Sequence, residues 1–139
     1  MLPEGDERTG LTRQWLTKAA RDLRMADLAI GGTPSLRDMA VFHCQQAAEK
    51  AVKAFLVWSN QPFRRTHDIR GLVKLCIVIE PAFVALETPA VTLTPYVGEF
   101  RYPGDPDDPL EPSPEEAMRA RRLAQDVVDF VLARLPFAL

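Results

Sequence analysis

Apolar residues recur at intervals of three and four positions along most of this chain, which is the spacing of an amphipathic α-helix. The first such stripe predicts a helix from about Leu11 to Ile30, and Gly31 and Gly32 are expected to end it. Residues 1–8 precede the stripe and are largely polar, so we expect a flexible N-terminal leader there. The stripe consists of Leu11, Trp15, Ala19, Leu23, Ala26 and Ile30.

A second, longer stripe predicts the central helix of the fold. Ser35 is expected to cap its start, with Asp38 three residues on as in a capping box, and the helix is expected to end at about Trp58. With about 100° between successive residues, one arc of about 160° is apolar and rich in alanine, which lets neighbouring helices approach closely. The opposite arc, of about 140°, is polar and is expected to face solvent or a ligand. It contains Gln45, Gln46, Glu49, Lys50 and Lys53.

Met39 and Phe42 place apolar side chains on the polar side of this helix, as do Leu56 and Val57 near its end. A helix with apolar residues on both sides often takes part in the core and in an oligomer contact together. Either a dimer interface or a broader internal core accounts for these residues, and the pattern leaves both open.

The next two helices are predicted from shorter signals. Thr66 or Asp68 is positioned to cap a third helix, and Thr94 with Pro95 is positioned to begin a short fourth helix that runs toward Phe100. The apolar stripe of the third helix is Ile69, Leu72, Val73, Cys76 and Ile79.

A proline-rich, acidic loop separates these elements from the last helix. Residues 104–112 contain too many prolines for regular helix. Ser113 follows, with a proline next to it and Glu116 three residues on, which predicts the start of a helix that runs to about Leu135. The segments together predict an all-α fold, an up-and-down bundle of about five helices around a long second helix, in a single domain over residues 9–136.

The composition is that of a soluble protein with one core. The chain has 139 residues and a net charge of -2, so a broad polyanion-binding surface is not expected. No apolar run approaches the roughly 18 residues that cross a bilayer, and the N-terminus is too polar for a secretory signal, so we expect a cytoplasmic protein. Cys44 and Cys76 lie among apolar neighbours and are expected to be buried free thiols. No metal or cofactor site is expected, because a zinc site needs further ligands that are lacking here.

Four sequence fragments occur in a characteristic order along the chain. They are Trp15-Leu16-x-Lys18-Ala19-x-x-Asp22-Leu23, then Phe42-His43-Cys44-Gln45-Gln46-Ala47-Ala48-Glu49-Lys50-Ala51-x-Lys53-Ala54, then Thr66-His67-Asp68-Ile69, then Phe100-Arg101-Tyr102-Pro103. Together they resemble the HEPN domain family (higher eukaryote and prokaryote nucleotide-binding) over roughly residues 13–135.

The resemblance implies a helical bundle that is often dimeric. In bacteria and archaea such domains are frequently paired with a small nucleotidyltransferase, and the pair can act as a toxin–antitoxin module. Some HEPN proteins are metal-independent ribonucleases, which resemble one another in an arginine followed, after four to six residues, by a histidine. Others have no demonstrated catalysis.

The ribonuclease motif is not intact in this chain. By its position in the family, Arg101 matches the motif arginine, but no histidine follows it, and residues 105–108 include three aspartates that would repel a phosphate. Arg37 and His43 form a literal match elsewhere, yet on one helix their side chains point about 120° apart. A catalytic site is therefore not expected, and the alternative is an atypical site made by Arg101 with His67 or by Arg37 with His43.

We therefore expect a non-catalytic HEPN-type subunit that forms a homodimer, contacts a nucleotidyltransferase partner and binds a nucleotide or RNA. His67 follows Arg64 and Arg65 at the expected start of the third helix, where free backbone N–H groups favour anions. The candidate ligand-binding residues are Gln46, Lys50, Lys53, His67, Arg101 and Tyr102.

Several of these residues also have purely structural interpretations. Glu49 and Lys53 are four positions apart and could simply pair on the surface. His67 could cap or bond the loop before the third helix, and Tyr102 could be buried instead of stacking on a base. A ribonuclease toxin and a structural helical interaction protein are the alternative functions.

Overall fold

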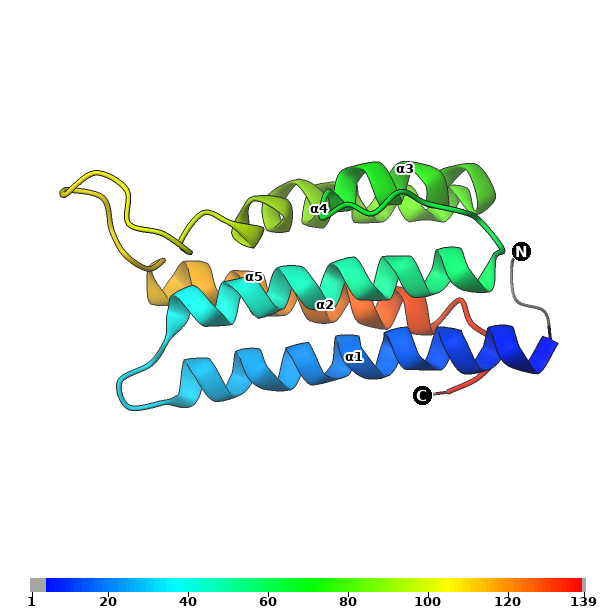
Figure 1. Ribbon diagram of the computed structural model, residues 1–139, viewed down its shortest axis with the longest axis horizontal. Coiled ribbons are helices and arrows are strands. Elements are labelled where there is room, and N and C mark those ends of the chain that lie inside the picture. The colour runs from blue at the N-terminus through cyan, green and yellow to red at the C-terminus, as the bar shows by residue number, and fades with distance from the viewer. Residues whose placement is uncertain (1–4, 139) are drawn as a thin grey trace.

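The computed structural model describes residues 5–138 and shows an all-helical protein (Figure 1). Its elements follow in the order α1 (Gly5–Gly31), α2 (Arg37–Trp58), α3 (Ile69–Ile79), η1 (Pro81–Leu86), α4 (Glu87–Leu93), η2 (Thr94–Val97) and α5 (Pro114–Leu132), where η marks a 3₁₀ helix. No strand forms within residues 5–138. The predicted all-α bundle of about five helices is confirmed.

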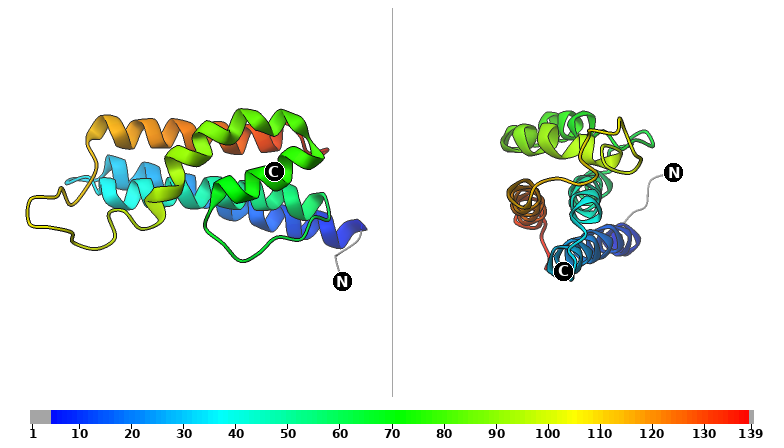
Figure 2. Two further views of the ribbon diagram at one scale, coloured as in Figure 1. Left: turned by 90° about the horizontal axis from the view of Figure 1, so that it is seen from above. Right: turned by 90° about the vertical axis from the view of Figure 1, so that its left-hand side faces the viewer.

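The α2 helix lies at the centre of the bundle (Figures 1 and 2). It runs antiparallel to α1 on one side, while α3 and α4 lie along its other side and α5 packs behind it in the view of Figure 1. On the side that faces the viewer in Figure 1, α2 has no helix in front of it. The loop between η2 and α5 extends beyond the end of the bundle where α1 turns into α2.

Small side chains let α2 occupy this central position. Its alanines at 40, 47, 48, 51 and 54 are all fully buried, so neighbouring helices approach its backbone closely. Larger rings fill the space farther out: the ring centroids of Phe55 and Phe83 are 4.4 Å apart, and those of Phe83 and Phe130 are 5.0 Å apart. The alanine-rich arc predicted for the second helix is thus the part of α2 that the core encloses.

Two predicted helix starts are wrong. The α1 helix begins at Gly5 and not at Leu11, so residues 5–8 of the expected leader are helical, while residues 1–4 lie outside the described part of the chain. The α2 helix begins at Arg37 with Leu36 at the N-cap position and no side-chain cap. Ser35 does not cap it; its hydroxyl instead accepts a hydrogen bond from the Arg37 guanidinium at 3.3 Å.

Of the later caps, Asp68 and Ser113 are confirmed. The Asp68 carboxylate accepts from the backbone N–H of Arg70 at 3.1 Å, and the Ser113 hydroxyl accepts from that of Glu116 at 3.1 Å. The short helix predicted to begin at Thr94 and Pro95 is η2, a 3₁₀ helix that ends at Val97 and does not reach Phe100. The α4 helix before it was not predicted; it includes Pro89, which is tolerated in a first turn where its missing N–H has no helical acceptor.

Thr94 does not cap a helix as predicted. Its hydroxyl donates to the carbonyl of Ala90 at 2.7 Å and accepts from the N–H of Ile69 at 3.2 Å, so it ties α4 to the start of α3. The last helix ends at Leu132, three residues before the expected Leu135, and continues in turns.

Cys44 and Cys76 are free and buried, as predicted. Burial raises the pKa of each thiol to about 12. None of the helices within residues 5–138 is both long and apolar enough to cross a membrane. Within the same residues, no three His, Cys, Asp or Glu side chains come together as a metal site.

Candidate binding face

The polar arc of α2 is less exposed than the sequence suggests. We call it the α2 polar face, and it consists of Gln45, Gln46, Glu49, Lys50 and Lys53. Gln45, Glu49 and Lys53 are only 0%, 3% and 6% exposed. Gln46 and Lys50 are half-buried. The expectation that this whole arc is open to solvent is wrong for the first three residues, because α1 and the segment before α3 supply side chains that cover them.

The Glu49 carboxylate organises one half of this face. Its Oε1 accepts from His67 Nδ1 at 2.8 Å and from Gln45 Nε2 at 3.1 Å. Its Oε2 accepts from Lys53 Nζ at 3.0 Å. Glu49 and Lys53 therefore pair as predicted, but they do so inside the protein and not on the surface. We call these four residues the Glu49 cluster.

Lys53 is enclosed by aromatic rings as well as by its counter-charge. Its Nζ lies 5.6 Å from the ring centroid of Trp15 and 5.8 Å from that of Phe63. A lysine in this position satisfies its charge within the fold. Lys53 is therefore a structural residue that holds Glu49, and its ammonium is not presented to a ligand.

Asp22 of α1 organises the other half of the face. Its Oδ1 accepts from His43 Nδ1 at 2.8 Å, and its Oδ2 accepts from Lys50 Nζ at 2.5 Å. Sequence reasoning missed Asp22 as a site residue. A signal was present, because Asp22 lies on the apolar stripe of α1 between Ala19 and Ala26, where a charged residue needs a partner. We call Asp22, His43 and Lys50 the Asp22 cluster.

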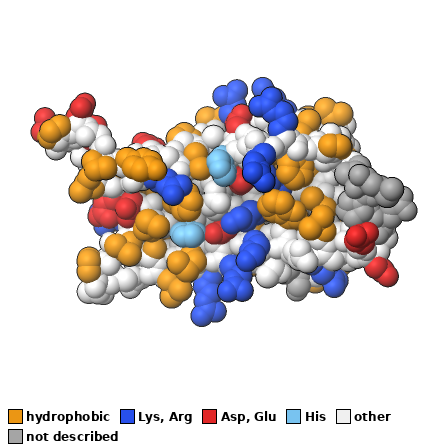
Figure 3. Space-filling model, viewed as in Figure 1, with side chains coloured by type: hydrophobic (Ala, Val, Ile, Leu, Met, Phe, Trp, Pro, Cys, Tyr) orange, Lys and Arg blue, Asp and Glu red, His pale blue; other side chains and the backbone are white. Residues whose placement is uncertain are grey.

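Both histidines are held in the same way. An ionised carboxylate only accepts hydrogen bonds, so Nδ1 of each ring carries the proton that it donates. In the neutral ring, Nε2 then has a free lone pair. The side chain of His67 is 62% exposed and that of His43 is 19% exposed. Figure 3 shows both histidines of the chain on the face where α2 is uncovered, among Lys and Arg side chains.

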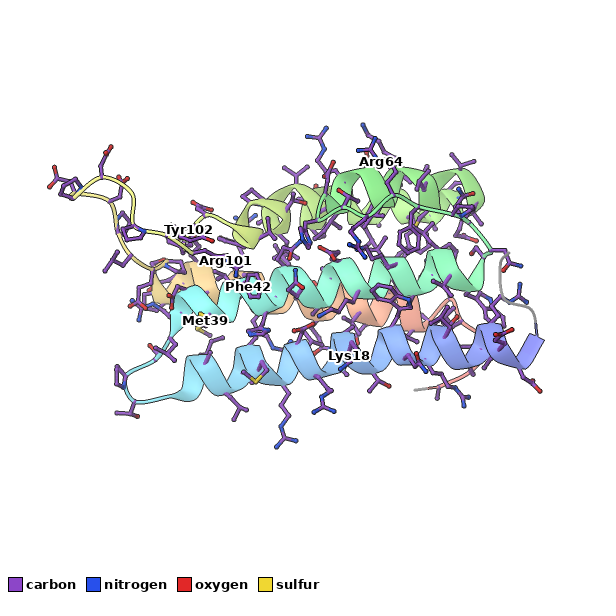
Figure 4. All side chains as sticks on the ribbon, viewed as in Figure 1. Lys18, Met39, Phe42, Arg64, Arg101 and Tyr102 are labelled. Atoms are coloured by element: carbon purple, nitrogen blue, oxygen red, sulfur yellow. The ribbon has the colours of Figure 1, made fainter. Side chains whose placement is uncertain are left out.

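Arg101 reaches this face from the turn that follows η2. Its guanidinium lies 4.7 Å from the ring centroid of Phe42, and the Phe42 and His43 rings meet edge to face at 5.3 Å. Tyr102 is 78% exposed, so it is not buried. Figure 4 shows Arg101 and Tyr102 beside Phe42 and Met39 of α2.

The two arginine–histidine combinations differ in their surroundings. Arg37 donates to the carbonyl of Pro112 at 2.7 Å and pairs with Glu111 at 2.8 Å, so it anchors the loop before α5. His43 points to α1 instead, and the two side chains of the literal motif match therefore diverge. Arg101 lies next to the aromatic ring that flanks His43, while His67 is bonded to Glu49.

Comparisons with known proteins agree with this fold. The family model for the HEPN domain matches residues 12–135. A solved structure, TT1696 from Thermus thermophilus, is similar with a TM-score of 0.75 and 34% identity, covering 89% of this chain and 98% of that one. The structure of ST0689, described as an archaeal HEPN homologue, is similar with a TM-score of 0.70 and 26% identity, covering 88% and 96%. No curated protein sequence matches the chain. With its four motif fragments arranged around a central α2 and a family match over nearly its whole length, the chain belongs to the HEPN domain family.

Proposed function

We propose that this chain is a non-catalytic HEPN subunit that binds a nucleotide on the uncovered side of α2 and pairs with a small nucleotidyltransferase, as in a toxin–antitoxin module. The observation that carries the binding role is the grouping of His43, Lys50, His67 and Arg101 on one uncovered side of the bundle. Each of these side chains is fixed by a partner in the fold, so little conformational entropy is lost when a ligand binds.

The distribution of charge on this face favours an anion. The carboxylates of Asp22 and Glu49 are directed inward, with side chains 10% and 4% exposed. Lys50 and His67 are more open, with side chains 24% and 62% exposed. Further Lys and Arg side chains are exposed around them (Figure 3). The accessible charge is therefore more positive than the net charge of -2 of the whole chain implies.

The surroundings of Arg101 support a non-catalytic role. General acid–base cleavage of RNA needs a histidine within reach of the reacting hydroxyl, beside a cation for the phosphate. The loop that follows Arg101 offers exposed aspartates in that place, and the backbone N–H of Asp105 donates to the Asp108 carboxylate within it at 3.0 Å. A phosphate held by Arg101 would meet these negative charges.

Thermal melting with ATP and GTP tests the binding role. A ligand that binds only the folded state raises the melting temperature in proportion to the logarithm of its concentration above the dissociation constant. We expect a concentration-dependent rise that is reduced in His67→Ala, with Arg122→Ala of α5 as a control. Unchanged melting temperatures at millimolar nucleotide would contradict the proposal.

The pairing role rests on exposed apolar side chains beside the binding face. Met39 at the start of α2 is 45% exposed and lies on the same end of the bundle as the exposed Tyr102 (Figure 4), and Leu36, the residue before α2, is 52% exposed. Such a group fits a protein contact, either with a nucleotidyltransferase or with a second copy in a homodimer. A neighbouring nucleotidyltransferase gene whose product co-purifies with this chain would support the pairing. If the Met39→Glu variant no longer co-purifies with that product, the contact surface would include the start of α2.

A metal-independent ribonuclease is the second candidate, favoured by the carboxylate–histidine pairs. In Asp22–His43 and Glu49–His67 the carboxylate orients the ring and leaves Nε2 able to accept a proton, the arrangement of a general base. Expression of the chain alone in a bacterial host separates the two functions. Growth arrest that disappears in His43→Ala or His67→Ala would favour the ribonuclease, whereas normal growth with a nucleotide-dependent melting temperature would favour the binding subunit.

A further inference from the structure

A cavity of ≈ 270 Å³ lies on the α1 side of the α2 polar face. Its walls are Leu11, Gln14, Trp15 and Lys18 of α1, with Lys50 reaching in from α2. This pocket therefore combines apolar and aromatic surface with one side-chain amide, from Gln14, and two ammonium groups, from Lys18 and Lys50. That combination suits a small ligand with a flat ring at one end and a negative charge at the other.

Trp15 provides a rigid wall to this cavity. Phe63 packs against it edge to face, with the centroids 6.4 Å apart, and the Lys53 ammonium lies 5.6 Å from its ring. Lys53 of the Glu49 cluster therefore helps Phe63 to hold the indole in place. A preorganised indole is a good stacking surface for a nucleobase, because little side-chain freedom remains to be lost.

The charged part of the cavity is provided by Lys18 and Lys50. Lys18 is exposed, and within residues 5–138 no side chain pairs with its ammonium. Lys50 is held at Asp22, whose second oxygen bonds His43. Asp22 offsets the charge of Lys50 in part, so the unpaired Lys18 supplies the excess positive charge that an anion needs. In Figure 4 Lys18 lies on the same side of the molecule as Arg64 and Arg101.

We propose that this cavity is the base-binding subsite for a nucleoside monophosphate, with the base against Trp15 and Leu11 and the phosphate bound by Lys18 and Lys50. This inference rests on the proposed nucleotide binding, and it specifies the pocket in which the base of the nucleotide lies. The volume of ≈ 270 Å³ is just below the usual range for drug-sized ligands, roughly 300–1,000 Å³. This volume suits a single base, and the sugar and phosphate would then extend toward Lys18 and Lys50.

The fluorescence of Trp15 can be used to test this proposal. The chain has two tryptophans, so a Trp58→Phe protein leaves Trp15 as the sole indole fluorophore while keeping a ring against Phe137. Adenosine monophosphate should quench this fluorescence in a saturable manner, because its base would stack on the indole. Ribose 5-phosphate and inorganic phosphate, which lack the base, should not quench it. A nucleotide that raises the melting temperature yet leaves the emission of Trp15 unchanged would overturn the subsite.

Lys18→Ala tests the phosphate contact without disturbing the fold, since Lys18 has no partner to lose among residues 5–138. Its affinity for adenosine monophosphate should fall roughly tenfold, the usual effect of one lost charged contact. The matched control Lys74→Ala, an exposed lysine of α3, should bind as tightly as the parent. Nucleotide binding that is equally tight in Lys18→Ala would overturn the subsite while the proposed function survives. If no nucleotide alters either the melting temperature or the fluorescence, both fall together.

Discussion

At the scale of single residues, the Glu49 carboxylate joins three side chains that come from two segments of the chain. His67 lies before α3, whereas Gln45 and Lys53 lie one turn to either side of Glu49 on α2. A buried ion pair of this kind is costly to break from one side only, because the remaining charge has no water to stabilise it. Glu49 is therefore a residue on which both stability and the shape of the face depend.

Glu49→Ala should lower the free energy of unfolding by about 3 kcal/mol or more, since Lys53 is then left buried without a counter-charge. Urea denaturation followed by circular dichroism measures this. The double variant Glu49→Leu with Lys53→Met removes both charges and should regain most of the loss. A single variant that loses less than about 1 kcal/mol would show that Lys53 reaches water when Glu49 is absent.

The residues of the site were predictable to different degrees. The sequence correctly places His43, Lys50 and Lys53 on α2 by helical periodicity. It could not place Asp22 or His67 against them, because those contacts depend on how α1 and the segment before α3 pack on α2. The burial of Lys53 follows from the same packing, and no spacing along α2 indicates it.

At the scale of elements, the helix caps show what local sequence decides. Ser113 and Asp68 cap α5 and α3 because each is followed by a helix that begins directly after it. Ser35 also precedes a helix, but the N–H of Leu36 donates to the carbonyl of Ala29 at 2.8 Å, which ties the turn to the end of α1. The start of α2 is thus set by a contact between two helices and not by Ser35.

The two serines give a matched pair of variants. Ser113→Ala should lower the free energy of unfolding by about 1 kcal/mol, because the N–H of Glu116 loses its acceptor. Ser35→Ala should change it by less than about 0.5 kcal/mol, since no helical N–H depends on that hydroxyl. Thermal or urea denaturation compares them. Equal losses for both serines would mean that Ser35 also caps α2 in solution.

At the scale of the whole molecule, the alanines of α2 set the distance between the helices. Ala48 is fully buried, so Ala48→Leu should force neighbouring helices apart and cost about 1–3 kcal/mol. The exposed Ala85 of η1 is a suitable control, because Ala85→Leu adds the same atoms without entering the core. Urea denaturation again gives the comparison, and a stable Ala48→Leu protein would show that the core around α2 contains spare volume.

The bundle was predictable from the sequence because each helix carries its own stripe, and the alanine-rich arc of α2 indicated which helix is central. The short elements after Ile79 were less predictable. There α4 follows η1 without a capping side chain, and the hydroxyl of Thr94, the first residue of η2, bonds Ile69 instead of capping that helix. Tertiary contacts decide those boundaries, whereas periodicity decides the long helices.

The stability of the whole molecule should fall at alkaline pH through its two buried thiols. Burial raises the pKa of both Cys44 and Cys76 from an ordinary value of 9.0 to about 12. A thiol whose pKa is higher in the folded protein than in the unfolded chain makes its full contribution to stability at pH values below the pKa of the unfolded chain. That contribution is lost as the pH rises from about 9 to about 12, because the unfolded chain releases the proton first.

Cys76→Ala separates this effect from the titration of lysines and tyrosines, which both proteins share. The variant should be less stable near neutral pH because of the cavity that it leaves. Between about pH 8 and pH 10.5, however, it should lose roughly 2 kcal/mol less than the parent, since one thiol no longer titrates in the unfolded chain. Urea denaturation at the two pH values measures the difference. Equal losses in parent and variant would mean that the Cys76 thiol ionises as readily in the folded protein as in the unfolded chain, and that the core around α3 admits water.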